Sequence, residues 1–162
     1  SEFLGQALPG VIRLRTLSKA HGLAGMRIGY AIAEPDVLAM MMKVRIHYAV
    51  SSFTQAAAEV VLDHPEEVQQ HIAAVKARRE QLRLHFIGLG ADVLPSATNF
   101  IGIRLSSAEL AAAVHQELLA EGVLVARLAH PELANVIRIT AVEDALVPGR
   151  LAALEKAIQQ HG

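Results

Sequence analysis

The sequence predicts an α/β fold, because short apolar runs alternate with longer segments in which apolar residues recur at helical spacing. Hydrophobic residues make up 52% of the 162 residues and charged residues 19%, a balance typical of a folded protein and not of a disordered one. Aromatic residues are only 4% of the chain and tryptophan is absent, so we expect an aliphatic core.

The composition disfavours several classes of function. The net charge of −1 leaves no basic field for nucleic acid or for an anionic membrane surface, and no apolar run is long enough to cross a bilayer. Cysteine is absent, which excludes disulfides and thiolate metal sites and fits a reducing compartment. The eight histidines lack the His-x-x-x-His spacing typical of zinc on a helix. We therefore expect a cytoplasmic protein without a metal site.

The first part of the chain is predicted to hold two strands around a loop. Residues 11–17 favour an interior strand, on which Arg13 and Arg15 share one face as solvated charges. Residues 27–33 form the predicted return strand. Residues 18–25 lie between them and contain glycines, which let a backbone turn sharply or approach a ligand closely.

Three helices are predicted next. Residues 34–44 begin with a proline in the first turn and carboxylates near the positive helix end. Ser52 is the predicted cap of a helix over residues 53–62, and Asp63 is the predicted N-cap of a long helix over residues 66–86. The basic residues of that long helix are expected to form a solvated face: Lys76, Arg78, Arg79 and Arg83.

The remainder of the chain again alternates between the two kinds of element. Strands are predicted at residues 91–95, 100–105, 123–128 and 136–140, with helices at residues 106–121 and 149–160. Because several links are too short for parallel crossovers, we expect a compact α/β domain with a mixed sheet from about residue 64 onward.

The glycine-interrupted loop carries the residues with the clearest chemistry. Lys19 can act as a point charge for a phosphate or, once desolvated or set beside another cation, as a nucleophilic amine. Arg27 suits a bidentate grip on phosphate oxygens, and Thr16 and Ser18 add hydroxyl groups. These residues predict a phosphate clamp with an amine beside it. A surface loop with one lysine and one structural arginine explains the same spacing equally well.

The order of residue types from Thr16 to Tyr30 is a more specific signal than the spacing of the charged residues alone. Thr-x-Ser-Lys-Ala-x-Gly-Leu-Ala-Gly-x-Arg-x-Gly-Tyr resembles the cofactor-lysine motif of the class I/II pyridoxal-phosphate-dependent aminotransferases of fold type I, and most closely that of the histidinol-phosphate aminotransferase branch. The resemblance implies that Lys19 is the catalytic lysine, which binds pyridoxal 5′-phosphate covalently. It also implies that Thr16, Ser18 and Arg27 are ligands of the cofactor phosphate.

Three further positions match segments that contact the substrate in that family. Val-Ile-Arg138-Ile-Thr resembles the family's Leu-Arg-Ile-Thr strand, which implies that Arg138 binds the substrate carboxylate; the alternative is an edge-strand arginine. Tyr48 matches the tyrosine of the family's Pro-Tyr-Asn-Val-Ser segment, although the proline and the asparagine are replaced. Asn99 matches the family's Ser-x-x-Asn-Phe segment, which implies a pocket role or, equally, a place in a hairpin-like turn. After Arg138-Ile-Thr, the family's Gly-Thr turn is lost.

The resemblance covers roughly the C-terminal half of the family. In those enzymes the cofactor lysine lies past the midpoint, whereas here it is residue 19, so we expect a truncated portion of a longer enzyme. The resemblance implies that residues 1–63 are the end of the large cofactor-binding domain with connecting helices, and that residues 64–162 are the small C-terminal α/β domain. The aromatic residue that stacks on the cofactor ring and the aspartate that pairs with its nitrogen belong to the other half.

By resemblance, the function is pyridoxal-phosphate-dependent transfer of an amino group between an amino-acid or amino-phosphate substrate and a 2-oxo acid, as in amino-acid biosynthesis. The expected partners are these small molecules and a second copy of the chain, because the family is dimeric. Two alternatives remain open. One is a non-catalytic fragment that folds as a small α/β domain. The other is a different fold type I enzyme, such as a threonine-phosphate decarboxylase or an aromatic aminotransferase.

Overall fold

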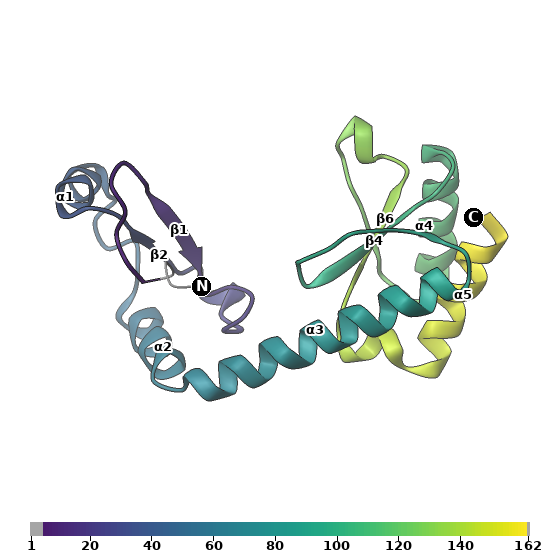
Figure 1. Ribbon diagram of the computed structural model, residues 1–162, viewed down its shortest axis with the longest axis horizontal. Helices are drawn as coiled ribbons and strands as arrows, with labels where there is room; N and C mark the ends of the chain where they lie inside the picture. Colours follow the sequence, from purple (N-terminus) through teal and green to yellow (C-terminus); the bar gives the residue numbers. More distant parts are fainter. Residues whose placement is uncertain (1–4, 162) are drawn as a thin grey trace. The chain divides into compact units, whose positions relative to one another are not determined.

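The computed structural model describes residues 5–161, so the first four residues of the expected domain 1–63 and the last residue of the expected domain 64–162 lie outside the described residues. The chain divides into two compact units, one up to His71 and one from Ile72 onward, which we call the N-terminal unit and the C-terminal unit. Both combine helices with a small sheet (Figure 1), and the predicted α/β class is confirmed.

The N-terminal unit is built around a two-stranded antiparallel sheet. Its elements are β1 (Arg13–Thr16), the short helix η1 (Ala24–Met26), β2 (Gly29–Ile32), α1 (Pro35–Val44), α2 (Ser52–Leu62) and the start of α3 (Pro65–Gly88). The two strands pair from Arg13 opposite Ile32 to Thr16 opposite Gly29. These elements lie where the sequence predicts them, with ends that differ by a few residues.

Two helix caps differ from the prediction. Ser51, not Ser52, caps α2, because Ser51 has the extended backbone of a cap and its hydroxyl accepts from the N–H of Thr54 at 3.1 Å. Asp63 ends α2 instead of beginning α3, since its own N–H donates to the carbonyl of Glu59 at 3.0 Å.

Few apolar side chains of the N-terminal unit are buried. Among its described residues, the buried apolar side chains are those of Leu17, Ala33 and Ala58. By contrast, Leu14 in β1 is 74% exposed and Val44 at the end of α1 is 85% exposed. The prediction that the first strand is interior is therefore wrong for this chain, because a two-stranded sheet offers no further strand to cover its outer edges.

The C-terminal unit holds a four-stranded sheet in the order β3-β4-β6-β5. Its elements after α3 are β3 (Asp92–Leu94), β4 (Phe100–Arg104), α4 (Ala108–Ala120), β5 (Ala126–Arg127), η2 (Pro131–Leu133), β6 (Val136–Thr140), η3 (Glu143–Leu146) and α5 (Pro148–His161). The side chain of Ser107 caps α4 by accepting from the N–H of Leu110 at 3.2 Å.

The predicted mixed sheet is wrong, because every strand pair described in the C-terminal unit is antiparallel. The alternation of strand and helix does produce one crossover, in which β4 and β5 run in the same direction and are joined through α4. However, β6 lies between these two strands and pairs with both. Parallel strands are therefore present without being neighbours.

One face of this sheet forms the core with the C-terminal part of α3, with α4 and with α5 (Figure 1). Alternate residues of β4 and β6 point to that face, and Ile101, Ile103, Ile137 and Ile139 are all buried there. Phe86 of α3 is the one aromatic residue in this cluster of buried residues, so the expected aliphatic core is confirmed.

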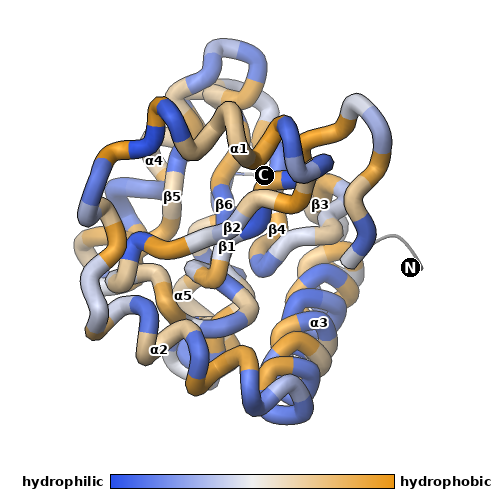
Figure 2. The backbone as a smooth tube through the Cα atoms, turned by 90° about the vertical axis from the view of Figure 1, so that its left-hand side faces the viewer, coloured by the Kyte–Doolittle hydropathy of each residue, from blue (hydrophilic) through white to orange (hydrophobic). Residues whose placement is uncertain are grey.

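Helix α3 carries a mixture of polar and apolar residues along its length (Figure 2), and none of the helices described is both long and apolar enough to span a membrane. Arg78 donates to the carbonyl of Ala141 at 3.4 Å and pairs with Glu143 at 3.3 Å. Arg79 donates to the carbonyl of Thr98 at 2.8 Å. The predicted solvated face is therefore wrong for these two arginines, which bind loops of the C-terminal unit.

Replacing Phe86 by alanine should destabilise the C-terminal unit by about 3–5 kcal/mol, because a fully buried aromatic side chain leaves a cavity in a close-packed core. Leu84→Ala on the same helix is the matched control: Leu84 is 55% exposed, so its loss should cost about 0.5 kcal/mol or less. Hydrogen exchange of peptides from β4 and β6 measures the difference. Equal protection in the two variants would contradict the position of Phe86 in the core.

Candidate functional site

The lysine loop, residues 16–29, is folded back on itself by backbone hydrogen bonds. The N–H of Leu23 donates to the carbonyl of Leu17 at 3.0 Å, and the N–H of Gly22 donates to the carbonyl of Lys19 at 3.1 Å. Gly22 has φ of +70°, a conformation that favours glycine. Leu17 is 2% exposed and anchors the loop, whereas Lys19 is exposed.

Thr16 and Ser18, two of the predicted phosphate ligands, lie together at the start of the loop. The hydroxyl of Thr16 donates to the hydroxyl of Ser18 at 2.8 Å and accepts from the N–H of Ser18 at 3.0 Å. The Thr16 proton is thus donated to Ser18, while the Ser18 hydroxyl keeps its own proton as a donor of the kind that phosphate oxygens bind.

Arg27 and Tyr48 both have an unusual backbone conformation. Their φ values are +53° and +58°, and they are the non-glycine residues with positive φ among residues 5–161. Such a conformation is strained for a bulky side chain and is found preferentially at functional sites. Both residues are among the site residues predicted from the sequence. The guanidinium of Arg27 donates to the carbonyl of Ala24 at 3.0 Å, and its remaining N–H groups suit an anion.

Gly29 allows the two strands that flank the loop to approach each other. It lies opposite Thr16 in the sheet, and a Cβ atom at this position would overlap the carbonyl oxygen of Arg15. Any other residue would therefore push β2 away from β1 at the base of the lysine loop.

The stretch of sequence around the loop is cationic, although two carboxylates from outside it lie close: Glu34 accepts from the N–H of Gly10 at 3.1 Å, and Glu67 lines a hollow with His21. Residues 5–33 contain four basic side chains (Arg13, Arg15, Lys19 and Arg27) and no Asp or Glu. None of the four forms an ion pair within the described part of the chain. Arg13 is not the solvated charge that was expected, because its Nε and Nη2 atoms are buried without a hydrogen-bond partner. This stretch favours an anionic ligand.

The other predicted substrate residues, Arg138 and Asn99, belong to the C-terminal unit. Arg138 lies opposite Gly102 in the middle of β6, with its guanidinium 5.0 Å from the ring centroid of Phe100. Its Nε atom is buried without a hydrogen-bond partner, which is costly unless an acceptor binds there. The edge-strand alternative is wrong, since β6 is a central strand. The carbonyl of Asn99 accepts from the N–H of Ala141 at 2.9 Å, at the end of the turn between β3 and β4.

A hollow of about 210 Å³ in the N-terminal unit borders the lysine loop at Ala20, His21 and Gly22 and is also lined by His64, His71 and Glu67. The ring of His64 contacts the carbonyl of Val60 at 2.7 Å, and this hydrogen bond raises the pKa of His64 above its usual value. Within residues 5–161, no group of three such side chains is placed to hold a metal ion.

Most of the chain matches one family of known proteins. Residues 3–154 match the family model described as aminotransferase class I and II. The chain belongs to this family. The predicted resemblance to class I/II aminotransferases is thereby confirmed.

Relatives that are similar in sequence include two kinds of aminotransferase. An aromatic amino acid aminotransferase of Nocardia farcinica is 44% identical over 64% of this chain and 29% of its own length. Histidinol-phosphate aminotransferase 1 of Carboxydothermus hydrogenoformans is 42% identical over 80% of this chain and 36% of its own length. This chain thus spans about a third of the length of these curated relatives.

A solved structure extends the likeness to the fold. Histidinol-phosphate aminotransferase from Sinorhizobium meliloti, in complex with pyridoxal-5′-phosphate, matches with a TM-score of 0.84 and 32% sequence identity. The match covers 96% of this chain and 43% of that chain.

The lysine loop fits pyridoxal phosphate, the cofactor that the aminotransferase family implies. The cofactor carries an aldehyde and a phosphate. Lys19 offers an exposed primary amine, and the hydrogen-bonded hydroxyls of Thr16 and Ser18 lie at the start of the same loop. The absence of acidic side chains from residues 5–33 suits the phosphate charge.

Two features of the site were not found from the sequence. The sequence places Phe100 at the end of the Ser-x-x-Asn-Phe segment and at the start of a strand, but it does not indicate that the ring lies beside the guanidinium of Arg138. That contact depends on pairing between strands far apart in the chain. The second feature is the absence of Asp and Glu from residues 5–33. The net charge of the whole chain hides it, whereas a count of charges segment by segment reveals it.

Gly29→Ala should loosen the pairing of β1 with β2, because the new methyl group would overlap the carbonyl oxygen of Arg15. The amide of Leu17, which donates to the carbonyl of Ile28 at 3.2 Å, should then exchange at least about tenfold faster. Gly25→Ala is the matched control, since a Cβ atom there meets nothing within 4 Å. Hydrogen exchange measured by NMR tests this, and equal rates in the two variants would show that the strands do not approach closely at Gly29.

Proposed function

We propose that this chain is the cofactor-lysine section of a pyridoxal-phosphate-dependent aminotransferase of the histidinol-phosphate type. Such an enzyme moves an amino group between an amino-phosphate or amino-acid substrate and a 2-oxo acid. The lysine loop carries the proposal: an exposed primary amine follows a pair of hydrogen-bonded hydroxyls in a cationic, acid-free stretch. Membership of the class I and II family supports it.

Each residue of the loop has a role in this proposal. When bound, pyridoxal phosphate supplies an electron sink for the substrate carbon that bears the amine. The Nζ atom of Lys19 would be the point of covalent attachment, and the hydroxyls of Thr16 and Ser18 with the guanidinium of Arg27 would hold the phosphate. Once displaced by the substrate amine, the Lys19 Nζ would act as the base that moves a proton at that substrate carbon.

The substrate side of the site is assigned to Arg138, Tyr48 and Asn99. A guanidinium grips a carboxylate or phosphate through two parallel hydrogen bonds, and the unpartnered Nε of Arg138 suits such an anion. The histidinol-phosphate aminotransferase relatives support an amino-phosphate substrate. An aromatic amino acid is the second candidate, supported by the relative from Nocardia farcinica.

We also propose that residues 1–63 belong to the large cofactor-binding domain and residues 64–162 to the small domain, and that the enzyme acts in the cytoplasm as a homodimer. The exposed apolar side chains of the N-terminal unit, among them Leu14 and Val44, support association with further polypeptide.

Incubation with pyridoxal phosphate followed by borohydride should fix the cofactor on Lys19, because the phosphate ligands hold it beside this amine. Peptide mass spectrometry of the whole chain locates the label. Lys19→Ala should abolish it, whereas Lys43→Ala should keep it, since Lys43 is an exposed lysine of α1 outside the loop. Labelling of all lysines alike, or a label that persists in Lys19→Ala, would refute the assignment.

The chain alone should show little or no transamination, because the resemblance implies that the groups which stack on the cofactor ring and pair with its nitrogen lie in the other half of the enzyme. Joining the chain to the preceding section of the Carboxydothermus hydrogenoformans relative should restore turnover of histidinol phosphate.

In this joined enzyme, Arg138→Gln should raise KM at least about tenfold with a smaller change in kcat, because it removes a bidentate contact with the substrate. Arg127→Gln on the neighbouring strand is the control and should change neither constant. Substantial turnover by the isolated chain, or equal effects of the two substitutions, would overturn these roles.

A further inference from the structure

A second hollow lies in the C-terminal unit and has no part in the proposed reaction. It has a volume of about 260 Å³ and is enclosed by the segment that follows α4, by β6, and by η3 and α5. None of the residues assigned to the cofactor or the substrate lines it. The side chain of Arg138 lies on the opposite face of the sheet, since the flanking Ile137 and Ile139 point into the core.

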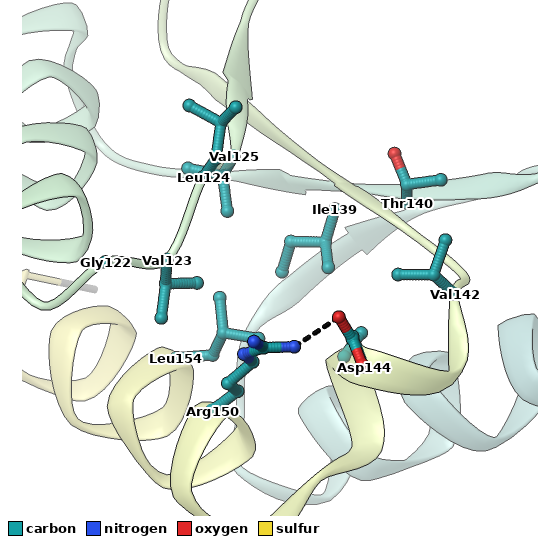
Figure 3. A pocket seen from close by; sticks show the side chains of 11 residues that line it. Gly122, Val123, Leu124, Val125, Ile139, Thr140, Val142, Asp144, Arg150 and Leu154 are labelled. Atoms are coloured by element: carbon teal, nitrogen blue, oxygen red, sulfur yellow. Dashed lines mark ion pairs between the residues drawn. The ribbon is translucent and has the colours of Figure 1, made fainter.

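An ion pair spans this hollow. Asp144 belongs to η3 and Arg150 to α5, and Figure 3 shows the Arg150 side chain reaching toward the Asp144 carboxylate. The two side chains are 69% and 48% exposed, so both keep hydrogen-bonding capacity toward solvent. Because the pair is neutral overall, a lone carboxylate would be repelled by Asp144 and a lone amine by Arg150. A ligand that carries both charges complements both groups.

The rest of the lining is apolar. Val125, Ile139 and Leu154 are at most 7% exposed and form the inner wall, whereas Leu124 is 81% exposed and Val142 is 46% exposed. Covering these two side chains with an apolar group is favourable by about 25 cal/mol for each Å² removed from water. The volume lies below the range of about 300–1,000 Å³ for drug-sized ligands, so it suits a smaller molecule.

We propose that this hollow binds a free apolar α-amino acid of about the size of leucine. Its ammonium group binds Asp144, its carboxylate binds Arg150, and its side chain packs against Val123, Ile139 and Leu154. The proposal does not depend on the aminotransferase function.

Another hollow of the same unit, of about 360 Å³, also contains an arginine and an aspartate, and it serves as the comparison. Arg104 and Asp92 are direct partners across β4 and β3, with a contact of 3.2 Å. The sheet register fixes the backbones of these two residues opposite each other. Asp144 and Arg150 also contact each other directly, but they come from two different helical elements and no strand pairing fixes their backbones.

Titration of the full chain with L-leucine, followed by methyl NMR and calorimetry, tests the proposal. Shifts are expected at the methyl groups of Val123, Val125 and Leu154. Asp144→Asn and Arg150→Gln should each weaken binding at least about tenfold, the typical effect of losing a charge-assisted contact. Two probes that each lack one charge, 4-methylpentanoate and 3-methylbutylamine, should bind the unaltered chain at least about tenfold more weakly than leucine.

Three controls make the result decisive. Asp92→Asn and Arg104→Gln should leave the affinity unchanged, because that pair belongs to the other hollow. Val123→Phe should block binding by filling the hollow, and hydrogen exchange of α5 verifies that each variant is folded. The absence of shifts around Val123, shifts confined to the other hollow or to the surroundings of Arg138, or equal binding of 4-methylpentanoate would overturn the proposal.

Discussion

Burial of one face of the β3-β4-β6-β5 sheet is the constraint on which the C-terminal unit depends. Ile101, Ile103, Ile137 and Ile139 lie on that face, and each buried side chain of this kind contributes about 1.5–3 kcal/mol. A slip of one residue in the pairing of β4 with β6 would turn the two isoleucines of the slipped strand to the other face, so the core determines the register. The same register places Arg138 on the other face of the sheet with Phe100. The position of the Arg138 guanidinium is thus a consequence of hydrophobic packing.

The lysine loop depends on a different kind of interaction. Its unit buries few apolar side chains, and a two-stranded sheet is marginal by itself. Backbone hydrogen bonds around Leu17, the hydroxyl pair of Thr16 and Ser18, and the close approach at Gly29 hold the loop. All of these are short-range contacts encoded within the loop and its flanking strands. Local contacts therefore determine the conformation of the loop. The exposed apolar side chains around it are of the kind that contact with further polypeptide would cover.

Much of the fold could be predicted because local signals agree with one another. Strand β6 falls on the predicted residues 136–140, since β-branched residues flank Arg138 and loops bound the run on both sides. The prediction of a mixed sheet is wrong because β6 inserts between β4 and β5, and no local feature of the sequence indicates this pairing of distant strands. Likewise, Arg78 and Arg79 look like solvated charges on a helix, and only the tertiary fold provides the carbonyls that they bind. In the candidate site, the sequence motif predicts roles for Lys19 and its neighbours, whereas the contact of Phe100 with Arg138 requires the sheet.

In the proposed function, the choice of substrate depends on the charge around Arg138 more than on the lysine loop. Amine and phosphate chemistry at Lys19, Thr16 and Ser18 serves any amino substrate, and sequence identity does not separate the two kinds of relative, at 44% and 42%. A guanidinium binds carboxylate and phosphate with the same bidentate geometry. A phosphate monoester, however, carries nearly two negative charges at neutral pH, whereas a carboxylate carries one. In the proposed function, a second cation beside Arg138 in the complete site would therefore favour an amino-phosphate substrate over an aromatic amino acid.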